Sequence, residues 1–269
     1  MLILIYFYPI IELIIQLFMS NFIGIIPARY DSTRFPGKPL VDIKGKSMIQ
    51  RVYEQAMKAG LKAVYVATDN QKIYNHVLLF GGNCLMTSNL HPSGTDRCME
   101  CAEQLKLDDS DIIINIQGDE PFIQPEQIVR LCNCFEEAET NIATLIKQIN
   151  NPQDLVTNTI PKVVVNKHQN AIYFSRSVIP FGAKKTNEEL LAAGVYFKHI
   201  GIYAYRVKVL KEISALAPTL LEQTESLEQL RWIENGYKIK TAITTEETIA
   251  IDTPYDLEKA IFLLTQVGE

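Results

Sequence analysis

From Phe22 onward, the chain alternates short apolar runs of strand length with longer segments of helical period. This alternation is typical of α/β layer folds, in which helices cover a largely parallel sheet. The 269 residues are enough to bury a hydrophobic core, and 47% hydrophobic with 21% charged residues is the balance of a globular protein. The pattern therefore excludes a disordered or fibrous chain.

The positions of these segments predict the order of elements. The apolar runs predict strands at residues 22–26, 63–67, 112–117, 142–146, 163–165, 172–175, 200–205 and 239–243. The segments of helical period predict helices at residues 47–59, 71–80, 95–107, 125–137, 207–215, 226–235 and 255–264. Because residues 142–205 hold several strands with little helix between them, we predict a mixed sheet with an antiparallel insertion.

The N-terminal segment differs in composition from the rest. Residues 1–18 are almost wholly apolar and approach the length of a membrane span, but they lack the basic residues and cleavage site of an export signal. We predict that residues 1–18 are an extension outside the working protein and that translation starts at Met19. A membrane anchor is the alternative. With no Gly/Ser-rich linker and no repeat, residues 19–269 are predicted to form one domain.

Charge and cysteine content restrict the partners and the compartment. The formal net charge of -5 argues against a protein that covers nucleic acid. The five cysteines are an odd number in a long chain, which does not indicate a disulfide framework. We therefore expect a cytoplasmic protein with no nucleic-acid partner and no stable membrane association.

The loop after the first predicted strand carries an unusual concentration of cations. Arg29, Arg34 and Lys38 lie there among hydroxyl side chains and a glycine. Ligands of α/β sheets bind at the carboxyl ends of the strands. Cations together with exposed backbone N–H groups would form an anion site suited to a polyphosphate. A basic surface loop is the alternative interpretation.

Two common phosphate-binding motifs are absent. Residues 45–47, Gly-Lys-Ser, match the end of a P-loop, but Leu40 stands where that motif requires its first glycine. No G-x-G-x-x-G sequence follows any predicted strand. A P-loop kinase or a dinucleotide oxidoreductase is therefore not expected. Residues 93–97, which open a predicted helix, could instead hold a nucleotide or merely cap that helix.

Two carboxylates are candidates for a metal site. Asp119 follows the buried strand predicted at residues 112–117, where it could hold Mg²⁺ against a phosphate. Asp252 stands just before the last predicted helix, and an N-cap is its alternative role. Two carboxylates beside a cationic loop suit Mg²⁺ with a nucleoside triphosphate. The reaction class indicated is displacement at a phosphoryl centre.

Seven sequence blocks in order resemble the 3-deoxy-manno-octulosonate cytidylyltransferase (CMP-Kdo synthetase) family. The blocks are IPARYDSTRFPGKPL (26–40), HPSGTDR (91–97), NIQGDEP (115–121), YFSRSVIP (173–180), HIGIYAY (199–205), SLEQLR (226–231) and IDTPYDL (251–257). The related sialic acid synthetases share the design of the first loop. The YFSR and LEQLR blocks favour the Kdo branch.

The resemblance implies a Rossmann-like nucleotidyltransferase fold and a homodimer. It implies an Mg²⁺-dependent enzyme that joins CTP and Kdo into CMP-Kdo and pyrophosphate for lipopolysaccharide biosynthesis. The anomeric hydroxyl of Kdo would attack the α-phosphorus of CTP in line, so no residue needs to be a covalent nucleophile. Alternatives are a cytidylyltransferase for 8-amino-Kdo or sialic acid, a nucleotide-binding regulatory module without chemistry, and a membrane-tethered scaffold.

The resemblance also implies a role for each site residue. The triphosphate would be held by Ala28, Arg29, Ser32, Arg34 and Lys38, and the cytidine would be placed with help from Ser93, Thr95 and Arg97. The sugar acid would be contacted by Gln117, Arg176, His199, Tyr203, Glu228 and Gln229. Asp119 and Asp252 would bind Mg²⁺ and, with Arg29 and Lys38, would be the catalytic residues.

Overall fold

The computed structural model describes residues 21–32, 34–247 and 249–267. The predicted extension at residues 1–18 and the predicted start at Met19 lie outside these ranges. Within them, no helix is both long and apolar enough to cross a membrane. The backbone divides into two compact units, Met1–Ile128 with Ile249–Glu269, and Val129–Thr248. The single domain expected for residues 19–269 stays a prediction.

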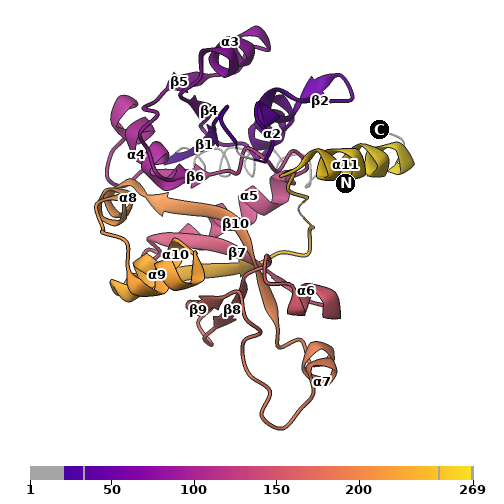
Figure 1. Ribbon diagram of the computed structural model, residues 1–269. Helices are drawn as coiled ribbons and strands as arrows, with labels where there is room; N and C mark the ends of the chain where they lie inside the picture. The colour runs from indigo at the N-terminus through magenta and orange to yellow at the C-terminus, as the bar shows by residue number, and fades with distance from the viewer. Residues whose placement is uncertain (1–20, 33, 248, 268–269) are drawn as a thin grey trace, which may run out of the picture. The chain divides into compact units, whose positions relative to one another are not determined.

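The first unit contains a parallel sheet. Its strands run in the order β6 (Ile112–Asn115), β1 (Phe22–Ala28), β4 (Ala63–Thr68) and β5 (Cys84–Met86), and every neighbouring pair is parallel (Figure 1). Helices α2 (Met48–Lys58), α3 (Gln71–Leu79) and α4 (Gly94–Gln104) pack against these strands. The sequence of β1 is a nearly continuous apolar run because this strand is buried on both faces.

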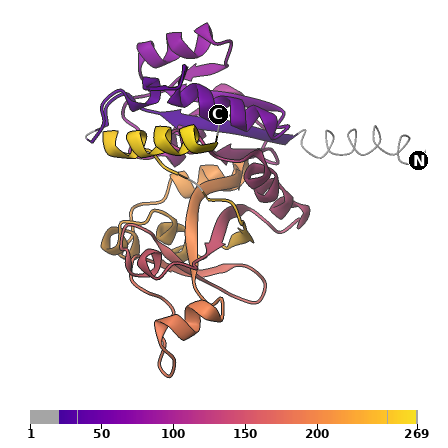
Figure 2. The ribbon, with the colours of Figure 1, turned by 90° about the vertical axis from the view of Figure 1, so that its right-hand side faces the viewer.

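The last helix returns to the first unit. Figure 2 shows this helix, α11 (Pro254–Val267), in yellow. Its Ala260 is buried in one apolar cluster with Ile251, Met48 and Ile43. A small hairpin, β2 (Asp42–Ile43) and β3 (Lys46–Ser47), supplies one side of this cluster. Burying these side chains holds the segment before α11, which includes Asp252, in a fixed place.

The second unit contains the mixed sheet. Strand β7 (Ile142–Gln148) pairs antiparallel with β10 (Phe197–Arg206) and parallel with β11 (Ile239–Ile243). Strand β8 (Lys162–Val165) pairs antiparallel with both β10 and β9 (Ala171–Ser175). The predicted mixed sheet with an antiparallel insertion is therefore confirmed.

The remaining helices are short. In the second unit they are α6 (Pro152–Val156), α7 (Asn187–Ala192), α8 (Val207–Ser214), α9 (Leu220–Glu225) and α10 (Gln229–Glu234). Helix α5 (Pro125–Asn133), continued by the 3-10 turn η3 (Cys134–Glu136), spans the sequence boundary between the units, and η2 (Lys38–Leu40) follows the cationic loop.

Every predicted strand and helix is found, and all of them except the strand at residues 239–243 have shifted ends. The helix predicted at residues 226–235 begins only at Gln229. Ser226 has a φ of 52°, the left-handed conformation that ends α9. The predicted helix 125–137 is wrong at its end, because residues 134–136 tighten into a 3-10 turn. Strand β5 and helices α6, α7 and α9 were not predicted, since such short segments show too little periodicity.

Candidate active site

The cationic loop and the Asp119 segment meet because their strands are neighbours. Strands β1 and β6 are parallel, with Ile25 opposite Asn115, so the loops that follow them leave the same edge of the sheet. Gly118 allows the close approach of these loops. A Cβ added there would lie 2.7 Å from the Pro27 carbonyl oxygen, so this position requires a glycine.

A second glycine shapes the cationic loop. Gly37 has a φ of 72°, a left-handed conformation that favours glycine, and its N–H donates to the Tyr30 carbonyl at 2.8 Å. This bond closes the loop between Tyr30 and Gly37. Lys38 then starts the 3-10 turn η2.

The two segments line one cavity of about 270 Å³. Seven residues of the predicted site lie on its wall, together with Pro27, Asp31, Pro39 and Gly118; the seven are Ala28, Arg29, Ser32, Arg34, Lys38, Gln117 and Asp119. Three cations around one cavity at a sheet edge form an anion site, so the structure favours a polyphosphate ligand over the simple basic loop.

Both predicted metal ligands converge on the ammonium of Lys38. Its Nζ donates to Asp119 Oδ2 at 2.7 Å and to Asp252 Oδ1 at 3.1 Å. It also donates to the carbonyl of Ile251 at 3.2 Å. Arg34 Nη2 lies 3.1 Å from the same oxygen of Asp252. The two carboxylates, far apart in the sequence, therefore form one charge cluster at the cavity.

The carboxylate of Asp252 does not serve as the cap of α11. Asp256 Oδ2 accepts the N–H groups of Asp252 and Thr253, at 3.2 and 2.8 Å, and Thr253 Oγ1 accepts the N–H of Asp256. Those bonds satisfy the first turn of the helix. The alternative capping role for Asp252 is therefore not what the structure shows.

The chemistry of this cluster fits a magnesium ion completed by a phosphate. Two carboxylates and one backbone carbonyl surround a single cationic nitrogen within 3.2 Å, and oxygen atoms are the ligands that Mg²⁺ prefers. In the described ranges, no group of three or more His, Cys, Asp or Glu residues could hold a metal alone. Mg²⁺ commonly takes one or two carboxylates and completes its shell with water and substrate phosphates.

Glu120 is a buried acid that the sequence analysis missed. Its side chain is 7% exposed, and Oε2 has no hydrogen-bond partner. Burial, and secondarily the charge of Asp119, raises the pKa of Glu120 to about 8. The Glu120 side chain is therefore mainly neutral at pH 7.

The start of α4 adjoins the cavity wall. Ser93 Oγ accepts the N–H of Asp96 at 3.2 Å while the Asp96 carboxylate accepts the N–H of Ser93, so the capping alternative for this segment is confirmed. A Cβ at Gly94 would lie 3.5 Å from the ring of Pro27, which lines the cavity. Thr95 is buried.

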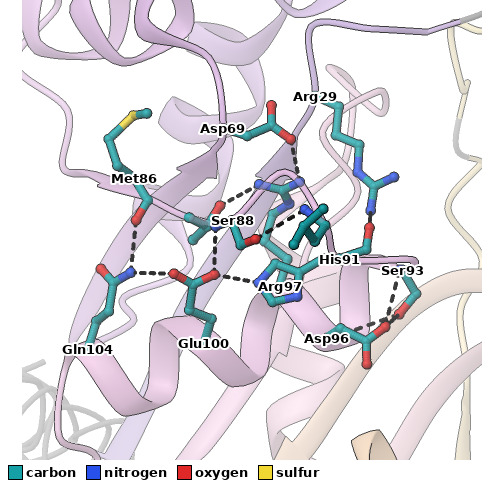
Figure 3. Close-up of polar contacts among 12 residues, drawn as sticks. Arg29, Asp69, Met86, Ser88, His91, Ser93, Asp96, Arg97, Glu100 and Gln104 are labelled. Atoms are coloured by element: carbon teal, nitrogen blue, oxygen red, sulfur yellow. Dashed lines mark hydrogen bonds and ion pairs between the residues drawn. The ribbon is translucent and has the colours of Figure 1, made fainter.

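The structure places Arg97 inside the first unit rather than at the cavity surface. Its side chain is fully buried, Nη2 lies 2.7 Å from Asp69 Oδ2, and Nη1 donates to Thr87 Oγ1 (Figure 3). Asp69 directly follows strand β4. Arg97 therefore joins α4 to the ends of β4 and β5.

A second carboxylate on α4 anchors the loop before it. Glu100 accepts the N–H of Ser88 at 2.8 Å and a hydrogen bond from His91, and Arg29 donates to the His91 carbonyl (Figure 3). Burial alone would raise the pKa of Glu100, but the bonds from His91, Ser88 and Gln104 together lower it. This network connects α4 to the cationic loop, and neither Asp69 nor Glu100 belongs to a motif that indicated such a role.

Two of the predicted sugar-binding residues, His199 and Tyr203, lie on either side of a bulge in β10. The register against β7 shifts between Ile200 and Tyr203, which brings the rings of His199 and Tyr203 to 5.2 Å between centroids. In a regular strand, residues four apart are separated by about 13 Å. Thr144 Oγ1 lies 3.0 Å from His199 Nε2 and donates to the carbonyl of Ile202 at 2.8 Å. Burial lowers the pKa of His199 to about 3, so its ring is neutral at pH 7.

Gln229 and Glu228 stand at the start of α10. The side-chain Nε2 of Gln229 is buried and has no hydrogen-bond acceptor among the described residues. Buried donors of this kind require a partner, and a sugar hydroxyl would supply one. Trp232, the single tryptophan, packs edge-on against Tyr203 with centroids 5.1 Å apart.

Arg176 is held by backbone carbonyls. Its Nε donates to Glu225 at 2.8 Å, Nη2 to Ser226 at 3.1 Å and Nη1 to Asn158 at 3.2 Å. Three of the five N–H groups of an arginine are thus occupied. The guanidinium holds the loops around it, and these contacts with the described residues leave two of its N–H groups for a ligand.

Comparison with known proteins connects this arrangement to characterised relatives. The family described as cytidylyltransferase matches residues 23–240. The chain is 56% identical over 250 residues to the 3-deoxy-manno-octulosonate cytidylyltransferase of Parabacteroides distasonis, which covers 91% of this chain and 99% of the relative. It is also 56% identical over 244 residues to the protein of the same name from Bacteroides thetaiotaomicron, with 89% and 96% covered.

Solved structures agree with these relatives. The structure of CMP:2-keto-3-deoxy-manno-octonic acid synthetase complexed with CTP superposes with a TM-score of 0.84 at 44% identity, over 92% of this chain and 99% of that one. A cytidylyltransferase from Leptospira borgpetersenii superposes with a TM-score of 0.59 at 14% identity. The second likeness concerns the fold alone.

Proposed function

The chain belongs to the 3-deoxy-manno-octulosonate cytidylyltransferase family, and from this premise we propose that it transfers CMP from CTP to the anomeric hydroxyl of Kdo and releases pyrophosphate. The observation that carries the proposal is the cavity in which Arg29, Arg34 and Lys38 adjoin Asp119 and Asp252. The names of the relatives favour Kdo over the alternative sugar acids.

The nucleotide half of the reaction depends on positioning and charge. Ala28, Arg29, Ser32 and Lys38 hold the triphosphate in the cavity, and the cations offset the charge that develops on the departing pyrophosphate. Helix α4 is held in place by the contacts of Arg97 and Glu100, and Ser93 and Thr95 at its start position the cytidine. Arg97 contributes through Asp69 rather than by direct contact, because its side chain is buried.

Asp119 and Asp252 would hold Mg²⁺. The metal supplies Lewis-acid polarisation of the phosphate and charge neutralisation when it is bound. The role of these two carboxylates is to fix its place beside the cavity, and Lys38 is close enough to both carboxylates to balance their charge.

Binding of the sugar acid depends on polar side chains that lie beside packed aromatic rings. The guanidinium of Arg176 suits the Kdo carboxylate, while Gln117, His199, Tyr203, Glu228 and Gln229 suit its hydroxyls. The neutral ring of His199 orients the sugar without adding charge. The oxygen of the Kdo hydroxyl bonds to the α-phosphorus and its proton passes to water. The bond from that phosphorus to the bridging oxygen breaks, and pyrophosphate departs with the bond electrons.

We also propose the setting in which the enzyme works. The family resemblance and the cytoplasmic substrates support a cytoplasmic homodimer that supplies CMP-Kdo for lipopolysaccharide biosynthesis. Light scattering after size-exclusion chromatography should give about twice the chain mass of 30.5 kDa. A mass of one chain at micromolar concentration would contradict the dimer.

Pyrophosphate release across a panel of substrates tests the reaction. With Mg²⁺ and CTP, we expect release with Kdo and none without a sugar acid. Equal turnover with N-acetylneuraminate, or better turnover with 8-amino-Kdo, would contradict the substrate assignment. Binding of CTP without turnover of any sugar acid would indicate the regulatory module instead.

A further inference from the structure

We propose that the ammonium of Lys38 occupies the position of the metal ion until a triphosphate draws it away, so that the nucleotide completes the metal site. The inference rests on the proposed function for its metal ligands and goes beyond it in assigning an order to binding. In this proposal Lys38 hinders binding of the divalent cation before the nucleotide arrives, and it contacts the phosphates afterwards.

The geometry places one nitrogen where a metal would bind. Asp119 Oδ2, Asp252 Oδ1 and the Ile251 carbonyl all lie between 2.7 and 3.2 Å from Lys38 Nζ. An oxygen-coordinated cation that bridges the two carboxylates needs these same oxygen atoms. A divalent ion and the ammonium therefore compete for one position.

The charge count leads to the same conclusion. The two negative charges of Asp119 and Asp252 are matched by the two positive charges of Lys38 and Arg34, which contact them directly. A balanced cluster offers little attraction to a dication. A triphosphate brings several negative charges, which attract both the metal and the lysine.

Lys38 can make this exchange without a rearrangement of the backbone. It belongs both to the carboxylate cluster and to the wall of the cavity that the triphosphate would enter. Its side chain is 14% exposed, at the edge of that cavity, and its four-carbon stem has several rotatable bonds. A change of rotamer is therefore enough to move the ammonium from the carboxylates to the phosphates.

Binding of Mn²⁺ to the purified protein without nucleotide tests the exchange directly. The probe is Mn²⁺ alone, and the readout is the loss of the free-ion signal in electron paramagnetic resonance. Because a cation within about 4 Å is removed, Lys38→Met should bind Mn²⁺ about tenfold or more tightly than the wild type. Adding Asp119→Asn to Lys38→Met should return the affinity to the wild-type level or below.

The control is Lys58→Met, which removes an exposed charge outside the cavity, where Lys58 Nζ donates to Gln55 at 2.8 Å. It should leave Mn²⁺ affinity unchanged. Unchanged or weaker affinity in Lys38→Met would overturn the proposal, as would equal tightening in Lys58→Met or tightening that survives Asp119→Asn.

A second variant covers the case in which Lys38→Met does not fold. Lys38→Gln keeps a polar donor near the carboxylates, and Mn²⁺ should raise its melting temperature while leaving that of the wild type unchanged. An equal shift in both proteins would overturn the exchange. Because these readouts need neither CTP nor Kdo, a failure of the exchange is distinct from a failure of the proposed reaction, which the pyrophosphate assay reports.

Discussion

Single side chains set the chemistry of the candidate site. Asp119 and Asp252 are far apart in the sequence, yet both contact Lys38. The amide variants Asp119→Asn and Asp252→Asn keep the shape and remove the charge that would hold a hard cation. We expect each to lower kcat by about 10² to 10³, the usual cost of one oriented electrostatic contact.

Steady-state kinetics with circular dichroism tests this expectation, because the fold should be retained. Asp42→Asn is the matched control, because this carboxylate is exposed and accepts the local N–H of Gly45 at 3.2 Å. Wild-type turnover in either active-site variant would show that the metal lies elsewhere.

Arg176 should influence the sugar more than the nucleotide. Removing its guanidinium in Arg176→Ala is expected to raise KM for Kdo about tenfold while KM for CTP changes little, since its free donors suit a carboxylate. Glu225→Gln is the control. It alters the carboxylate that accepts the backbone N–H of Arg176 at 2.9 Å, and it leaves the guanidinium in place. An equal rise in both KM values would assign Arg176 to the nucleotide or to folding alone.

Motifs in the sequence predicted the residues that line the cavity but not those that hold them. Arg29, Lys38 and Asp119 could be found because charged residues directly follow strands, where ligands bind. Glu120 was missed because nothing in the sequence distinguishes a buried acid from its charged neighbour. Glu100 was missed because its partners, Ser88 and His91, are fixed by the path of a loop.

At the scale of elements, the ion pair between Arg97 and Asp69 should contribute to the free energy of unfolding. Asp69→Asn would leave a buried guanidinium without its counter-charge, and breaking such a pair costs about 3–5 kcal/mol. We expect urea unfolding to show this loss, with a raised KM for CTP because α4 is displaced. Asp108→Asn removes an exposed carboxylate beyond the end of α4 and is the control. A stability within experimental error of the wild type would contradict a structural role for this pair.

An ion pair between Glu222 of α9 and Arg231 of α10 should make the stability of the protein depend on pH. Arg231 donates to Glu222 from Nε at 2.7 Å, and this bond is the main reason that the pKa of Glu222 is lowered. Because the folded state lowers this pKa, the stabilisation is complete above the unfolded value of about 4.3 and is lost as the pH falls through the folded value.

The variant Glu222→Gln should therefore be less stable by about 1.5–3 kcal/mol at pH 7, with the difference shrinking below about pH 4. Thermal unfolding of both proteins between pH 3 and 8 measures the difference, and Glu139→Gln, at an exposed position, should show none. A difference that is constant with pH would mean that the charge of Glu222 does not stabilise the helices.

Elements were predictable where their apolar pattern is strong. Strand β11 lies at the predicted residues 239–243, and β10 was found with its ends extended, because both carry strong apolar patterns. Helix α9 has six residues and buries none of them, so no apolar face indicated it. The bulge in β10 could not be predicted either, since pairing with β7 creates it.

At the scale of the whole molecule, the two substrates are assigned to different parts of the chain. The cavity residues and the metal ligands belong to the unit that includes both the first strand and the last helix, and most of the sugar-binding residues belong to Val129–Thr248. The sequence predicted one domain from its lack of a linker. The division depends on the contacts within each unit of the folded chain. Amino-acid composition does not show these contacts, so the division could not be predicted from the sequence.

The central claim is that the Kdo hydroxyl attacks the α-phosphorus of CTP, and phosphorus NMR of the complete reaction tests it most directly. With the enzyme, Mg²⁺, CTP and Kdo, the three CTP resonances should be replaced by one phosphodiester resonance of CMP-Kdo and one resonance of pyrophosphate. The integral of the pyrophosphate resonance should be twice that of CMP-Kdo, because pyrophosphate has two equivalent phosphorus atoms. Omitting Kdo or chelating Mg²⁺ should leave CTP unchanged. Formation of free CMP with pyrophosphate, or of CDP with a phosphorylated sugar, would contradict the account.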